Sequence, residues 1–142
     1  MQLDNVARRL ETFRREQGIA YTLGNPTSEA AIAEAERRLG VTLPAQVRAF
    51  YERYNGLLVA EPHAEILPVE RLEYTAPHRL RFAIMDHTHD LYFDTSHTNP
   101  ARQWDIVTKE GYRVTFTMAS LWSNRLWAWV IKRRGIWVPE HR

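Results

Sequence analysis

The spacing of hydrophobic residues changes along this chain, and the change constrains the fold class more than any other feature. Up to residue 54, apolar side chains recur at helical intervals, which predicts three helices, over residues 3–17, 29–39 and 44–54. Thr27 or Ser28 is the expected N-cap of the second helix. Gly40 suits the left-handed position at which many helices end.

After residue 56 the interval between apolar residues shortens towards two, which is typical of strands. The order of the strand-like segments predicts an antiparallel meander over residues 79–84, 91–94, 104–106 and 112–116. Helical spacing then returns, from a cap at Thr117 or Ser120 to a stop at Gly135. We therefore expect the α+β class, with N-terminal helices, an antiparallel-rich central sheet and a C-terminal helix packed on the sheet.

The size and composition narrow the kind of protein. A chain of 142 residues is expected to form a single domain over 1–142, since domains usually have roughly 100 to 200 residues. The absence of cysteine excludes disulfides, thiolate zinc sites and cysteine nucleophiles. A net charge of +2 is too weak to indicate nucleic-acid binding. The longest apolar run covers only residues 126–131, so we expect a cytoplasmic protein without a membrane segment.

A group of potential metal ligands invites an enzymatic interpretation. Its members lie within one polar stretch: Asp86, His87, His89, Asp90, Asp94 and His97. If the link is extended, His87 and His89 point to one side and a neighbouring carboxylate completes a zinc or manganese site. One candidate is therefore a small metal-dependent hydrolase that uses Asp86, His87, His89 and Asp90. We favour the alternative, a solvated hairpin tip, because strand patterns flank the stretch, and we expect no catalytic residue, metal or cofactor.

Two further features have a structural and a functional interpretation. Residues 29–54 imitate a DNA-binding helix-turn-helix, but the polar residues of the second helix have almost no net charge, which favours ordinary helix packing over a DNA-binding regulator. On a regular helix, Trp127 lies some 140° from Trp122 and shares a mostly polar face with Ile131 and Arg134. An exposed aromatic residue there suits a protein interface, whereas packing against Trp137 is the alternative.

Residues 34–56 carry a helix with glutamate and Leu-Gly, then Leu-Pro opening a second helix with an aromatic residue, then Asn-Gly. The positions are Glu36, Leu39, Gly40, Leu43, Pro44, Phe50, Asn55 and Gly56. This pattern resembles the SUKH superfamily. Three later segments are similar to further blocks of the family: a strand and short helical turn at 66–72, a strand at 90–96, and the start of the closing helix at 118–122. The chain departs from the family pattern at Leu57 and in the hairpin 86–90, where the family favours glycine. A positive φ in that hairpin would strain threonine or histidine.

The resemblance implies a binding function. Bacterial members resemble immunity proteins that neutralise a cognate toxin, often a nuclease or a deaminase, and fungal relatives regulate cell-wall synthesis. The matched residues are structural by their chemistry, and the resemblance implies no catalytic set and no cofactor. We expect a cognate protein toxin as partner and leave the oligomeric state open. The expected partner-binding residues are Asp86, His87, His89, Asp90, Asp94, Trp127, Ile131 and Arg134.

Overall fold

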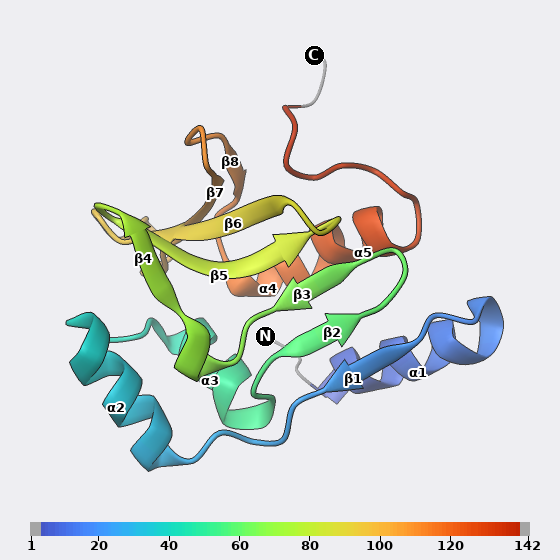
Figure 1. Ribbon diagram of the computed structural model, residues 1–142, viewed down its shortest axis with the longest axis horizontal. Coiled ribbons are helices and arrows are strands. Elements are labelled where there is room, and N and C mark those ends of the chain that lie inside the picture. The colour runs from blue at the N-terminus through green and yellow to red at the C-terminus, as the bar shows by residue number, and fades with distance from the viewer. Residues whose placement is uncertain (1–3, 140–142) are drawn as a thin grey trace.

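The computed structural model describes residues 4–139, and the first part of this chain is mainly helical (Figure 1). Helix α1 spans Asp4–Gln17, α2 spans Glu29–Leu39 and α3 spans Ala45–Arg53. These are the three predicted helices. The predicted start of the first helix, at Leu3, lies outside the described residues.

The ends of α2 follow from local chemistry. Ser28 Oγ accepts a hydrogen bond of 3.1 Å from the backbone N–H of Ala31, which satisfies one of the unpaired donors at the helix start. At the other end Gly40 has a φ of 69°, and its N–H donates to the carbonyl oxygen of Glu36. The left-handed conformation at this glycine ends the helix, and both predicted ends are confirmed.

Helix α3 begins one residue later than predicted. Pro44 has a φ of −58° and a ψ of 157°, so it is the N-cap residue and not the first helical residue. The turn before it is held by Glu36, whose Oε2 accepts a hydrogen bond of 2.7 Å from the N–H of Leu43. Farther along α3, the hydroxyl of buried Tyr51 donates to the carbonyl oxygen of Leu67 at 2.7 Å. The side chains of Glu36 and Tyr51 therefore fix the backbone of the chain outside their own helices.

The middle of the described chain forms an eight-stranded sheet in which every pairing is antiparallel (Figure 1). The spatial order is β1-β2-β3-β5-β6-β7-β8, and β4 pairs with β5. The strands are β1 Tyr21–Leu23, β2 Leu57–Val59, β3 Ala64–Ile66, β4 Glu73–Ala76, β5 Arg79–Met85, β6 His89–Asp94, β7 Asp105–Thr108 and β8 Arg113–Thr115.

Strand β5 organises this sheet because it pairs with three other strands. Its first half lies beside β4 and its second half beside β3, while β6 runs along its other edge. Phe82 of β5 and Phe93 of β6 are both buried and stack with their ring centroids 3.9 Å apart. The meander β5 to β8 confirms the predicted order of the four segments.

Strands β1, β2 and β4 were not predicted as separate elements, whereas the strand expected at the start of 66–72 corresponds to the end of β3 at Ile66. The predicted helical turn after β3 is present as the 3₁₀ turn η1, Val69–Arg71. Asn55 holds this turn from a distance in sequence. Its Oδ1 accepts a hydrogen bond from the N–H of Val69, and its Nδ2 donates to Glu70 Oε1, both at 2.8 Å.

The closing helical segment consists of α4 (Met118–Ser120), the π-helical turn η2 (Leu121–Arg125) and α5 (Leu126–Val130). It begins as predicted, because Thr117 Oγ1 accepts a hydrogen bond of 3.0 Å from the N–H of Ser120. In the π-helical turn, the N–H of Leu126 donates to the carbonyl oxygen five residues back, at Leu121.

The predicted stop of this segment at Gly135 is wrong. Arg133 already has a left-handed φ of 57°, and its N–H donates to the carbonyl oxygen of Trp129. The next N–H, from Arg134, donates to Ala128. These bonds close the helix end before Gly135, so an arginine in the left-handed region takes the position that glycine was expected to hold.

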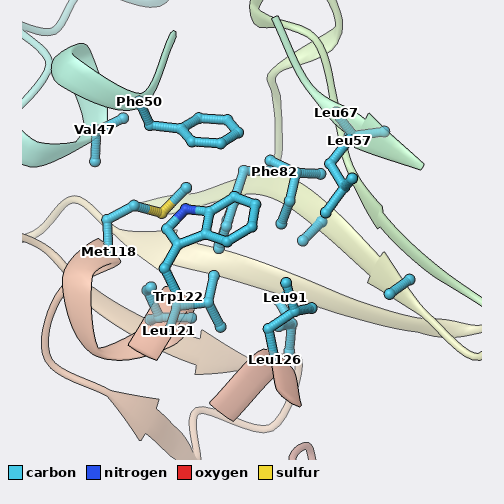
Figure 2. Packing of buried hydrophobic residues seen from close by; sticks show 14 of the residues in the cluster. Val47, Phe50, Leu57, Leu67, Phe82, Leu91, Met118, Leu121, Trp122 and Leu126 are labelled. Atoms are coloured by element: carbon cyan, nitrogen blue, oxygen red, sulfur yellow. The ribbon is translucent and has the colours of Figure 1, made fainter. Parts of the chain in front are cut away.

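The core lies between α3, the sheet and the closing helical segment. Figure 2 shows Phe50 of α3 above the indole of Trp122, with Phe82 and Leu91 of the sheet nearby. The centroids of the Phe50 and Trp122 rings are 5.0 Å apart at an interplanar angle of 28°. The C-terminal helix thus packs on the sheet, and the α+β prediction is confirmed.

We expect Phe50→Ala to lower the free energy of unfolding by about 3 to 5 kcal/mol, because it opens a cavity at a fully buried ring. Urea unfolding measures the loss. The matched control is Phe116→Ala, at a ring that is 48% exposed, with a cost of about 1 kcal/mol or less. Equal losses for the two variants would contradict this description of the core.

Candidate functional site

The tip of the β5–β6 hairpin carries the first candidate residues. Asp86 and His87 have φ values of 50° and 66°, so the positive φ expected at the missing glycine is present. Both side chains are exposed. The backbone is held by His63, whose carbonyl oxygen accepts a hydrogen bond of 2.9 Å from the N–H of Asp86 and whose Nδ1 accepts one of 2.9 Å from the N–H of His87.

The sequence analysis did not single out His63, which lies between β2 and β3 and supports the hairpin tip. Its ring stacks on that of His87, with centroids 4.1 Å apart and an interplanar angle of 16°. Burial, followed by the charge on His87, holds the pKa of His63 below its ordinary value, against the opposing effects of Glu65 and Asp86. Because His63 Nδ1 accepts a hydrogen bond, protonation at that nitrogen breaks the contact that supports the tip.

The prediction that His87 and His89 point to one side is wrong. His87 lies in the left-handed turn and packs on His63, whereas His89 stacks on Trp137 with ring centroids 4.3 Å apart. Trp137 also meets Trp129 edge to face at 4.8 Å. The extended link that the prediction assumed is absent because the chain reverses at Asp86 and His87.

Two of the carboxylates of the stretch, Asp90 and Asp94, pair with arginines instead of converging on one point. Asp90 Oδ2 lies 3.8 Å from Arg81 Nη1, and Asp94 Oδ2 lies 3.5 Å from Arg79 Nη1. Burial acts to raise the pKa of Asp94, but hydrogen bonds from Ser96 and the charge on Arg79 outweigh it and hold this pKa below its usual range. Strand β5 thus neutralises much of the negative charge of β6.

His97 lies apart from the hairpin tip. Its Nδ1 is 3.0 Å from Ser96 Oγ, and its Nε2 is 3.8 Å from Asp105 Oδ2. Across residues 4–139, no three histidine, aspartate or glutamate side chains come together in a way that could hold a metal ion. His89 and Asp90 instead line a small polar hollow of about 180 Å³, together with Lys109, Glu110 and Trp137.

The prediction that Trp127 is exposed is wrong, since this residue is 5% exposed. The prediction assumed a regular α-helix, in which Trp122 and Trp127 point in different directions. The hydrogen bond of η2 spans five residues instead and brings the two side chains to the same side, with ring centroids 6.3 Å apart. Helix α1 then covers Trp127. The ring of Phe13 lies 5.3 Å from it, and the guanidinium carbon of Arg9 lies 5.0 Å from its ring centre.

The other residues of the predicted patch remain nearer the surface. Ile131 is half-buried and Arg134 is exposed. Trp137, which we considered as the cover of Trp127, packs on His89 and Trp129 instead. Of the predicted patch, Trp127 is therefore part of the core, and only Ile131 and Arg134 are accessible to a partner.

The polar residues of the apparent helix-turn-helix are engaged within the fold. Arg48 Nη1 lies 3.3 Å from Glu36 Oε1, and Arg48 Nη2 lies 3.5 Å from Glu29 Oε1. Gln46 Oε1 accepts a hydrogen bond of 2.9 Å from the N–H of Ala119, which fastens α3 to α4. These contacts agree with helix packing as the role of the pair. Among the described residues no helix is long and apolar enough to cross a bilayer.

A sequence profile of the SMI1/KNR4 family (SUKH-1) matches residues 26–121. The chain belongs to this family. The match covers more than half of the chain and runs from the segment before α2 to the start of η2. A comparison with curated proteins found no match.

The SUKH-1 match divides the surface features into two groups. The hairpin tip with His63 and His87 lies inside the matched region, whereas α1 and Trp137 lie outside it. The contact between α1 and Trp127 is thus built from two segments that the family profile does not include. The spacing of apolar residues predicted α1, but no local pattern predicts a contact between residues so far apart in sequence.

The low pKa of His63 generates a prediction. At mildly acidic pH the unfolded chain binds a proton at His63 more readily than the folded protein does. The contribution of neutral His63 to the free energy of unfolding is therefore complete above pH 6.5 and is lost as the pH falls below that value. Urea unfolding from about pH 7 to about pH 5 measures this loss. The variant His63→Asn keeps a hydrogen-bond acceptor but does not titrate. We therefore expect its free energy of unfolding to fall less over this pH range than that of the wild-type protein.

The control for loss of a histidine is His78→Asn, at an exposed position whose φ of 61° also suits asparagine. A pH dependence that His63→Asn and His78→Asn alter equally would contradict the assignment to His63.

Proposed function

We propose that this chain is a bacterial immunity protein that acts in the cytoplasm. It binds a cognate polymorphic or contact-delivered toxin, a nuclease or a deaminase, and neutralises it as a stoichiometric protein inhibitor. The observation that carries this proposal is membership of the SMI1/KNR4 family (SUKH-1), because the bacterial members that the chain resembles include immunity proteins.

The contacts of the hairpin favour binding over catalysis. The side chains that a metal-dependent hydrolase would use have separate partners: His87 packs on His63, His89 on Trp137, and Asp90 pairs with Arg81. A catalytic metal needs ligands that are held together and oriented by further contacts. The family is moreover a family of non-enzymatic domains.

The principal experiment is co-expression with the toxin domain encoded beside the gene of this protein. We expect protection of growth and an equimolar complex on size-exclusion chromatography. Protection without detectable binding would argue for enzymatic detoxification instead. Elemental analysis of protein purified without a histidine tag tests the same alternative, since stoichiometric zinc or manganese would favour the hydrolase.

The hairpin tip is one proposed contact with the toxin. Asp86 is exposed, and its carboxylate makes no ion pair with any residue between 4 and 139, whereas Asp90 and Asp94 are paired. If the toxin presents a basic surface, we expect Asp86→Lys to slow association, most strongly at low salt. Stopped-flow binding measures the rate. The control is Asp94→Asn, at a paired carboxylate, and an equal effect of both changes would argue against the tip.

A further inference from the structure

A groove separates α1 from the start of the closing helical segment. Its volume is about 590 Å³, and its apolar lining comes from Val6 and Phe13 on α1 and from Ala119 and Trp122 on the opposite side. Val6 and Trp122 are each 4% exposed, so these two side chains form a packed floor and not a loose surface. A groove of this size between helices can receive the apolar side of a peptide segment.

Among the side chains that the structure describes, the charges that line the groove have one sign. Arg8 and Arg9 line it, and none of its described lining residues is acidic. Arg8 is exposed and forms no ion pair within the described part of the chain, while Arg9 donates to the carbonyl oxygen of Ser123 at 3.4 Å and lies over Trp127. Two other helix arginines are neutralised locally, since Arg14 and Arg37 each pair with a glutamate three residues earlier.

We propose that this groove docks an acidic amphipathic segment of the toxin, and this assignment of the partner rests on the function proposed above. An apolar side chain of the segment lies on Val6, Phe13 and Trp122. Carboxylates on the same segment meet the guanidinium groups of Arg8 and Arg9, which suit paired hydrogen bonds to carboxylate oxygens. The apolar lining provides the area of contact, and the arginines select the charge of the partner.

The place of the groove in the chain indicates that it determines specificity. One wall is α1, which lies outside the family match, and the other wall begins inside the match at Ala119. The docking segment is acidic, so in a toxin that acts on nucleic acid it differs from the basic surface that contacts phosphates. The inhibitor would thus hold such a toxin through a second surface, next to the site that it blocks.

The test uses two fluorescein-labelled peptides that carry the same apolar residues and differ only in having glutamate or lysine at the remaining positions. Fluorescence anisotropy at low salt is expected to show binding of the glutamate peptide alone. Arg8→Glu should weaken it roughly tenfold or more, since a charge-assisted hydrogen bond contributes about 1.5 to 3 kcal/mol. Arg15→Glu is the matched control, because Arg15 is exposed on α1 outside the groove.

A second variant tests the shape of the groove without changing its charge. Ala119→Trp fills the space beside Trp122 and should abolish peptide binding, with thermal unfolding as the check that the variant is folded. If the Ala119→Trp variant does not fold, Arg8→Glu still tests the proposal. The Arg8 side chain makes no ion pair in the described chain, so its replacement breaks none. Equal binding of both peptides, or equal effects of Arg8→Glu and Arg15→Glu, would overturn the proposal.

The same variants separate this proposal from the proposed function. If Arg8→Glu loses the peptide but still neutralises the toxin from the neighbouring gene as wild type does, the groove is not the toxin site and the immunity function stands. If wild-type protein neutralises no such toxin while the glutamate peptide binds and Arg8→Glu prevents it, the immunity function fails and the groove remains a site for acidic segments.

Discussion

The stack of Phe50 on Trp122 joins α3, which precedes β2 in the chain, to the helical segment that follows β8. Phe50 comes from α3 and Trp122 from η2, and both are buried against the sheet (Figure 2). The same junction includes the hydrogen bond from the N–H of Ala119 to Gln46. Because these contacts set the position of η2, they also set the floor on which α1 lies. The positions of η2 and of α1 therefore both depend on this one pair of rings.

Rules that act within a few residues predicted much of this fold. The cap at Ser28 and the left-handed Gly40 located both ends of α2, and the alternation of apolar residues located β5 to β8. The sequence analysis gave Asn55 only as a position that matches the family pattern. In the structure it also holds the 3₁₀ turn η1 through Val69 and Glu70, a role that depends on residues far away in sequence.

The candidate sites were harder to predict because they depend on such distant contacts. The supporting contact between His63 and His87 joins residues 24 positions apart, and the contact of Phe13 with Trp127 joins the two ends of the chain. The hairpin residues were found from their chemistry, but their directions were not, since a left-handed turn reverses the chain at Asp86. The spacing of apolar residues does not predict that a helix from the first part of the chain will cover the closing helical segment.

The π-helical turn η2 acts as one extra residue inserted into an α-helix. An α-helix turns by about 100° per residue, so if the same residues were bonded as a regular α-helix, everything after the turn would rotate by about that angle. Trp127 would then leave the floor beneath α1, although every core side chain before Leu121 kept its place. The family match ends at this residue. A relative with one residue fewer here needs no π-helical turn to hold its counterpart of Trp127 beneath the first helix. A relative of equal length with a regular α-helix here would share the sheet and the first core, yet would present a different face to its first helix, and so a different partner surface.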